Sequence, residues 1–415
     1  AKYGSEAALK VAWGWWALNN GMLENQKIPK DESWADKRIY PVGNPWFYNP
    51  SNLNGSQRGL RQRLLDTMQF LYELQNTVYA RYGEALRKAG YDGELVSSNW
   101  QAGRMMSHFY NLHSDALVGT VDRHNYFGGG TRGTGPFNAA SMLSSPGSGM
   151  LSSGLQQVAG RPFMLSEWIH VFPNEWGAEG VALIGAYGMG LQGWDASYPF
   201  QNGDKGNFSC SLGQQWDVTA PQVIGLFPAV SRQVHRGDIA ESSIVHYRNV
   251  HIDSLPEQRV GFSESVEQTG DIKRLTTNVF PAEALAVAKS QVKFTGSFRE
   301  TKSFDLEAFK EGDDLLSSTG QLRWRGGKSS QSGFFTIDTP GTQAVVGFAA
   351  GETLTLGDVT LEPTSRFSAL YLSAKSNQGT LADDAILITA MARARNADQL
   401  VVNEKMVVHS HLKYE

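Results

Sequence analysis

Glu167 is the residue of this chain whose type and position most readily suggest chemistry. It follows a short apolar run that begins after Pro162 and is itself followed by Trp168. An apolar run bounded by proline is typical of a buried strand. A carboxylate at the end of such a strand lies at the rim of the sheet, and in a parallel barrel this rim carries the active site. A structural role, in which Glu167 pairs with an arginine or caps the next helix, fits the motif equally well.

Three further runs are predicted to be strands with polar or aromatic ends. They cover residues 94–100, 116–126 and 189–195, and helices are predicted between them. Strands that alternate with helices indicate a parallel sheet or barrel. The residues at their ends are Asn99 and Trp100, then His124 and Tyr126, and finally Trp194 and Asp195.

This order of strand ends resembles the last four strands of the (β/α)8 retaining glycoside hydrolases, the clan that includes cellulases, mannanases and β-galactosidases. The similarity covers about residues 90–240. It implies that Glu167 is the catalytic nucleophile, that His124 and Tyr126 are catalytic groups beside it, and that Trp194 forms the floor of the sugar subsite. The remaining residues expected to bind substrate are Asn99, Trp100, Trp168, His170, Trp176 and Asp195.

A retaining mechanism needs a second carboxyl group, about 5–5.5 Å from the first, as the acid/base. In the clan this group is a glutamate preceded by asparagine at the end of the fourth strand. The first residues of this chain, from Ala1, resemble the segment that follows that strand. The resemblance therefore implies an Asn-Glu pair upstream of Ala1, in an N-terminal segment or a separate barrel fragment. Asn174-Glu175 is the nearest such pair within the chain, and Glu175 is an acid/base, a loop residue or a subsite contact.

The composition changes along the chain. A long amphipathic helix is predicted over residues 58–89, whereas short alternating runs separated by Gly, Asp and Ser begin near residue 243. The latter predict an antiparallel β-sandwich. We therefore expect an α/β fold in which residues 1–240 form the barrel portion, with strands 5–8 and the active-site rim, and residues 241–415 form the sandwich.

Charge and composition exclude several classes of partner. The net charge of −4 and pI of about 6.2 predict no binding to nucleic acid or to an anionic membrane. Cys210 is the only thiol, which excludes a disulfide framework and a cysteine-based zinc site. The histidine spacings do not suit a metal site, so neither a metal nor a cofactor is expected. No apolar stretch is long enough to span a bilayer.

The aromatic residues favour a carbohydrate ligand. The chain contains 11 Trp, 14 Tyr and 20 Phe, many of them beside Asn, Asp, Gly or His. Sugar rings stack on aromatic faces while their hydroxyls bond amides and carboxylates. We expect a secreted, extracellular or periplasmic hydrolase that cleaves β-glycosidic bonds of a plant or algal oligo- or polysaccharide by retaining double displacement. The alternative is a non-catalytic carbohydrate-binding or scaffolding protein without an acid/base. Separately, His124 is either a catalytic group or a buried structural histidine.

Overall fold

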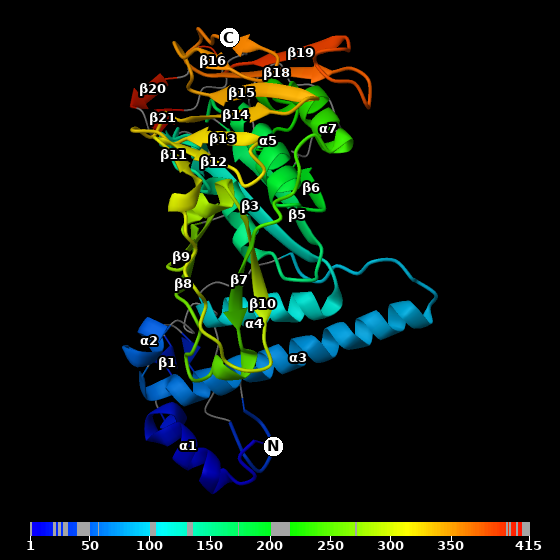
Figure 1. The fold of residues 1–415 in the computed structure, drawn as a ribbon. Coiled ribbons are helices and arrows are strands. Elements are labelled where there is room, and N and C mark those ends of the chain that lie inside the picture. The colour runs from blue at the N-terminus through cyan, green and yellow to red at the C-terminus, as the bar shows by residue number, and fades with distance from the viewer. Residues whose placement is uncertain are drawn as a thin grey trace.

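The computed structural model describes residues 2–19, 22–23, 26–27, 32–39, 50–56, 58–99, 105–130, 136–172, 174–200, 216–269, 272–395, 397, 400–403 and 406–408. Figure 1 shows the N-terminal helices at one end of the molecule and a large antiparallel sheet at the other. A mixed sheet and several helices lie between them. The candidate site belongs to this middle region.

The N-terminal region is helical, as predicted. The long helix α3 (Arg61–Lys88) packs against α4 (Met105–Val118), and Tyr72 of α3 donates a hydrogen bond to Nδ1 of His113 or accepts one from it, at 2.6 Å. The predicted helix 58–89 is thus confirmed. The other helices are α1 (Glu6–Asn19), α2 (Pro50–Asn54), α5 (Ala178–Leu183), α6 (Pro221–Ile224) and α7 (Phe227–Arg236).

A six-stranded mixed sheet carries the candidate site. Its strand order is β20-β21-β4-β3-β5-β6. The pairs β3–β5 and β5–β6 are parallel, whereas β4, β21 and β20 join by antiparallel pairing. The strands span Val121–Gly130 (β3), Pro136–Asn138 (β4), Phe163–Val171 (β5), Ala196–Pro199 (β6), Leu400–Asn403 (β20) and Met406–Val408 (β21).

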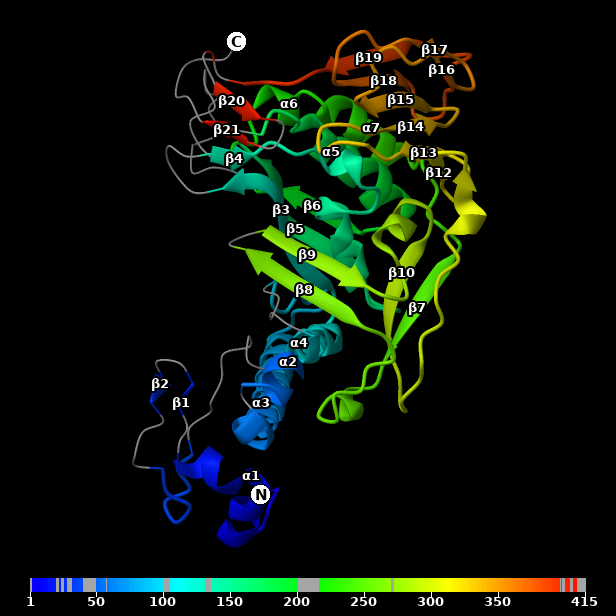
Figure 2. The ribbon, with the colours of Figure 1, turned by 90° about the vertical axis from the view of Figure 1, so that its left-hand side faces the viewer.

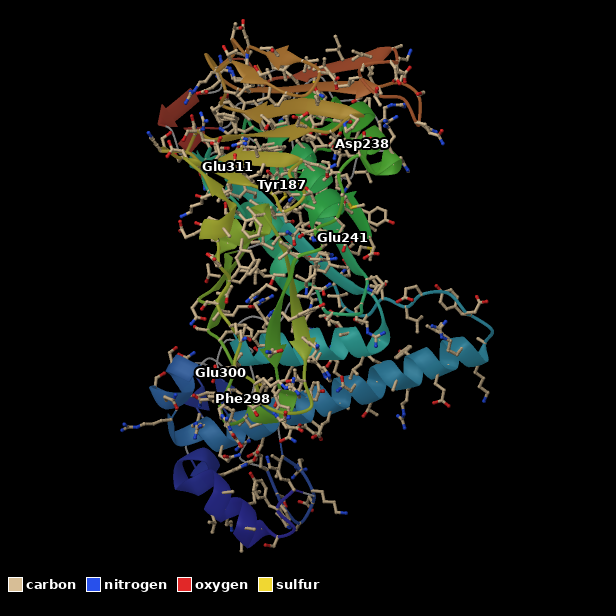
Figure 3. All side chains as sticks on the ribbon, viewed as in Figure 1. Tyr187, Asp238, Glu241, Phe298, Glu300 and Glu311 are labelled. Carbon is tan, nitrogen blue, oxygen red and sulfur yellow. The ribbon has the colours of Figure 1, made fainter. Side chains whose placement is uncertain are left out.

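A second sheet of seven antiparallel strands forms the C-terminal region, with the order β11-β12-β13-β14-β15-β18-β19. Tyr187, labelled in Figure 3, lies under it, with its ring centroid 4.9 Å from Trp324 and 5.2 Å from Phe335. The helices α5 and α7 contact the same sheet. Its strands span Lys310–Glu311, Asp314–Leu316, Leu322–Arg325, Phe334–Asp338, Thr342–Gly347, Ser368–Ala374 and Ile386–Met391.

Smaller elements connect the two large sheets. The parallel pair β7 (Val245–Val250) and β10 (Lys289–Phe294) and the hairpin β8 (Glu264–Thr269) and β9 (Ile272–Thr277) lie below the C-terminal sheet, as Figure 2 shows. Strand β9 contacts β3, so this region also supports the mixed sheet. The short hairpins are β1 (Met22–Leu23) with β2 (Gln26–Lys27), and β16 (Leu354–Thr355) with β17 (Thr360–Leu361).

Several predicted strand boundaries were wrong. Residues 94–99 form only one isolated bridge, between Val96 and Thr120, and α4 continues to Val118, so β3 begins at Val121. Residues 189–191 of the predicted strand 189–195 belong instead to a π-helix that spans Ile184–Leu191. The strand that follows is β6, so Trp194 and Asp195 precede a strand and do not end one.

The glycines of this helix explain the error at residues 189–191. A Cβ on Gly188 would lie 2.7 Å from the Trp194 ring, and a Cβ on Gly185 would lie 2.3 Å from Val230 of α7. These contacts are too close for any larger residue, so the glycines allow the helix to pack tightly on its neighbours. An apolar run rich in glycine resembles a buried strand in sequence, but here tertiary packing favours the helix.

The observed architecture is a mixed α/β fold with parallel strands and a separate antiparallel sheet. Among the described residues the parallel strands β3, β5 and β6 do not close into a barrel, and helices rather than a second large sheet cover the inner face of the C-terminal sheet. No helix in this described part is long and apolar enough to cross a membrane.

Candidate functional site

The site forms where β3 and β5 run side by side. His124 is paired in register with Glu167, and the register shifts by one residue between Arg123 and His124 because Ser166 is an extra residue on β5. Such a bulge changes the direction in which neighbouring side chains point. It brings the side chains of Ser166 and Glu167 to the same group of residues on β3.

Two donors hold one oxygen of Glu167. The Tyr126 hydroxyl donates a hydrogen bond to Oε2 at 2.5 Å, and His124 Nδ1 lies 3.1 Å from the same atom. The Glu167 side chain is 31% exposed, whereas that of His124 is 10% exposed. Both contacts fall on Oε2, and none of the described residues makes a hydrogen bond to Oε1.

The hydrogen bonds continue from His124 to a second carboxyl group. His124 Nε2 lies 3.1 Å from Ser166 Oγ, and Ser166 Oγ donates to Asp122 Oδ2 at 2.7 Å. The Ser166 amide also donates to Asp122 Oδ1, at 3.0 Å. One proton can therefore be shared along this path. In one arrangement the proton lies on His124 Nε2. In the other, the Ser166 hydroxyl has passed a proton on and Asp122 carries it. His124 Nδ1 donates to Glu167 in both arrangements.

The surroundings of Asp122 raise the pKa of its carboxyl above the usual value for an aspartate. Burial raises the pKa of the Asp122 carboxyl, and the hydrogen bonds from Ser166 oppose this rise. A buried carboxyl with a raised pKa can hold the shared proton at higher pH than an exposed one. Asp122, His124 and Tyr126 alternate along β3, so a strict period of two places all three on one face.

Aromatic side chains lie next to the Tyr126 ring. Phe200 contacts it edge-on, with ring centroids 5.9 Å apart, and Trp216 lies 6.0 Å from Phe200. Both side chains are half-buried beside the small cluster of Tyr126, Ile169 and Val171. Together they form an apolar surface beside the Tyr126 ring. Phe200, Trp216, Asp122 and Ser166 were not among the site residues predicted from the sequence.

Three predicted substrate-binding residues on and after β5 are buried. Trp168 is 3% exposed and belongs to the main hydrophobic core. His170 Nε2 lies 2.9 Å from Glu179 Oε1, with neither side chain exposed to solvent. Trp176 donates through Nε1 to the Ala139 carbonyl at 2.9 Å and packs on rings of the C-terminal sheet. These contacts give all three residues structural roles.

The other predicted binding residues do not gather around Glu167 either. Trp194 is 2% exposed and its ring lies 5.3 Å from Phe163, while Asp195 Oδ2 accepts a hydrogen bond from the Phe163 amide at 2.8 Å. Phe163 is the first residue of β5, which places this contact about 13 Å along the strand from Glu167. Asn99 is exposed in a coil segment. Trp100 lies outside the described residues.

Glu175 is buried and lies beside an arginine. Its side chain is 3% exposed, and Arg393 Nη1 lies 3.1 Å from its Oε2. The neighbouring Asn174 donates to the carbonyls of Asn138 and Ala140 at 3.1 and 2.8 Å. These contacts support the loop role of the Asn-Glu pair over an acid/base role.

No cluster of three or more His, Cys, Asp or Glu side chains that suits a metal ion occurs within the part of the chain that the structure describes. No protein-family model, no curated protein and no solved structure matches this chain. The site geometry therefore carries the functional argument.

Proposed function

We propose that the protein is a retaining glycoside hydrolase that cleaves β-glycosidic bonds of an oligo- or polysaccharide, with Glu167 as the nucleophile. The observation that carries this proposal is the pair of donors, Tyr126 and His124, on Oε2 of a carboxylate that is 31% exposed. They fix the direction of the carboxylate, while Oε1 faces the ligand. Phe200 and Trp216 provide the adjoining apolar surface.

The proposed reaction has two displacements. Oε1 of Glu167 attacks the anomeric carbon, the glycosidic C–O bond breaks, and the leaving oxygen takes a proton from the acid/base, giving a glycosyl ester of Glu167. Water then attacks the same carbon, releases the carboxylate and gives its proton to the acid/base. His124 and Tyr126 stay bonded to Oε2 in this scheme and act as catalytic groups through the charge they stabilise.

The finer architecture belongs to the same proposal. Strands β3, β5 and β6 are spatial neighbours in chain order, as expected for the last strands of a (β/α)8 barrel, and the antiparallel region corresponds to the accompanying sandwich. The acid/base, an Asn-Glu pair, would come from an N-terminal segment or a separate barrel fragment. A plant or algal polysaccharide lies outside the cytoplasm, so the proposal includes a secreted, extracellular or periplasmic location.

The direct test uses an aryl β-glycoside whose dinitrophenolate leaves without protonation. Such a substrate reports on Glu167 even when the acid/base is not part of the assayed chain. We expect release of the phenolate and, by proton NMR, a β-configured sugar as the first product. Binding of saccharides without turnover would support the non-catalytic alternative, and an α-configured first product would overturn the retaining mechanism.

Replacing Tyr126 with Phe should lower kcat by about 10- to 150-fold, with KM changed much less. The substitution removes a hydrogen bond to a charged group, worth about 1.5–3 kcal/mol, but keeps the ring against Phe200. Initial rates on the aryl glycoside measure this effect. The matched control is Tyr198→Phe, because Tyr198 is 57% exposed on β6. An unchanged kcat in Tyr126→Phe would remove the role assigned to its hydroxyl.

One observation favours a second candidate. Ser166 Oγ, His124 Nε2 and Nδ1, and Glu167 Oε2 have the connectivity of a Ser-His-acid triad, with both contacts at 3.1 Å. In that case Ser166 would attack an ester. However, its hydroxyl bonds Asp122 more closely, at 2.7 Å, which turns its proton away from His124.

Ser166→Ala separates the two candidates. The glycosidase predicts a fall in kcat of about fivefold, the value of one neutral hydrogen bond, and no reaction of the wild type with a fluorophosphonate probe. The triad predicts complete loss of esterase activity in Ser166→Ala and covalent labelling of Ser166 in the wild type, detected by peptide mass spectrometry.

A further inference from the structure

A pocket of about 300 Å³ lies at one edge of the C-terminal sheet. It is lined by Ser365, Arg366 and Phe367 before β18, by Ala392 and Arg393 after β19, and by Trp176. This volume is at the lower end of the range of about 300–1,000 Å³ for small-molecule sites. It suits a ligand of one ring.

The floor of the pocket is rigid and aromatic. The ring centroid of Trp176 lies 4.9 Å from that of Phe348 and 5.2 Å from that of Phe367, and those of Phe348 and Phe367 are 5.2 Å apart. Trp176 is anchored through Nε1 to the Ala139 carbonyl. The three rings therefore pack together as a base beneath the pocket.

Arg366 is held over this floor. Its guanidinium carbon lies 5.8 Å from the ring centroids of both Trp176 and Phe348, and Nη2 donates to Gln331 Oε1 at 2.9 Å. A guanidinium placed by stacking and by a neutral amide keeps its charge for another partner. Among the described residues no carboxylate lies within ion-pair distance of Arg366.

Arg393 supplies a second guanidinium. It is 46% exposed and pairs with the buried Glu175, with Nη1 3.1 Å from Oε2. The two arginines and this single carboxylate leave one positive charge in the pocket.

A second pocket on the same sheet provides a contrast. It also has a volume of about 300 Å³ and is lined by two arginines, Arg323 and Arg325. These two arginines are paired with Asp314, Glu311 and Glu352 at 2.7 to 3.4 Å. Glu311 is labelled near the edge of this sheet in Figure 3. The Arg366 pocket therefore differs from this second pocket of similar size in its excess of positive charge.

We propose that the Arg366 pocket binds a single sugar ring that carries an anionic group, either a carboxylate or a sulfate ester. Arg366 and Arg393 would bond the oxygens of this group, for which guanidinium geometry is well suited, and the sugar ring would lie beside them in the pocket. The sugar ring in this proposal rests on the proposed function, whereas anion binding follows from the arginines alone. The substrate class is then an acidic saccharide.

Binding of D-glucuronate, D-glucose 6-sulfate and D-glucose, measured by isothermal titration calorimetry, tests the proposal. We expect one or both anionic sugars to bind, glucose to bind at least about tenfold more weakly, and added salt to weaken the binding. Comparison of the two acids identifies the anionic group. Arg366→Gln should weaken binding by about tenfold or more, and Arg323→Gln, in the contrasting pocket, should leave it unchanged.

Arg393→Gln gives a second variant in case Arg366→Gln does not fold. Equal binding of glucose and the acids, no binding of either acid, or unchanged affinity in the pocket variants would overturn the proposal. Glu167→Gln separates its failure from that of the proposed function. Loss of acid binding in the arginine variants together with full glycosidase activity in Glu167→Gln would support the pocket and contradict the nucleophile.

Discussion

Replacing Glu167 with Gln is expected to lower kcat on an aryl β-glycoside by about 10⁴-fold or more, the scale seen when a nucleophile is removed. An amide does not form the glycosyl ester. It would also place an N–H group or a neutral oxygen against the donors of Tyr126 and His124. Because the side chain is 31% exposed, the free energy of unfolding should change by no more than about 1 kcal/mol.

A rescue experiment makes this prediction specific. In Glu167→Ala, added azide should occupy the space of the carboxylate, attack the anomeric carbon and give an α-glycosyl azide with release of the phenolate. Glu241→Gln is a suitable control, because Glu241 is 55% exposed, pairs with Lys289 and is labelled away from the C-terminal sheet in Figure 3. Full activity in Glu167→Gln would exclude Glu167 as the nucleophile.

The largest expected effect on stability comes from Glu264. It forms a fully buried ion pair with Arg248, and its Oε1 lies 3.2 Å from His108 Nε2. Burial lowers the pKa of His108, so its imidazole is neutral at pH 7 and Arg248 is the charged partner of Glu264 in this pair. Glu264→Gln would leave Arg248 buried without its counter-charge. We expect a loss of about 3–5 kcal/mol in the free energy of unfolding.

Urea denaturation measures this loss, with Glu311→Gln as the control. Glu311 and its partner Arg323 are 53% and 39% exposed, and breaking such a surface pair should cost no more than about 1 kcal/mol. Comparable midpoints for the two variants would show that the buried pair does not stabilise this region. At urea concentrations below the onset of unfolding, we expect the two variants to have the same glycosidase activity.

The central residues of the site could be predicted from the sequence because they lie on neighbouring strands. Glu167, His124 and Tyr126 were selected as ends of consecutive parallel strands, and the structure brings them together even though all three lie within their strands. Asp122 could also have been selected from its alternation with His124. Ser166 could not, because its contacts depend on a bulge that no local pattern indicates.

The aromatic and acidic residues show where the sequence was insufficient. Trp194 and Asp195 looked like a strand end, but the glycines before them form a tightly packed π-helix. Trp176 lies beside polar residues in the sequence, yet its packing partners, Phe348 and Phe367, come from far along the chain. Burial that depends on such distant partners is decided by tertiary packing, whereas the alternating C-terminal strands were predictable because their pattern is local.

Labelling with a 2-deoxy-2-fluoro glycoside that has a good leaving group tests the nucleophile most directly. The fluorine slows both displacements, and the good leaving group restores the rate of the first one only. The second displacement becomes the slow step, so the glycosyl ester accumulates. The account predicts a single added sugar on the peptide that contains Glu167, found by mass spectrometry and absent in Glu167→Gln. Labelling of a different carboxylate, with Glu167 unmodified in an enzyme that the reagent inactivates, would contradict it.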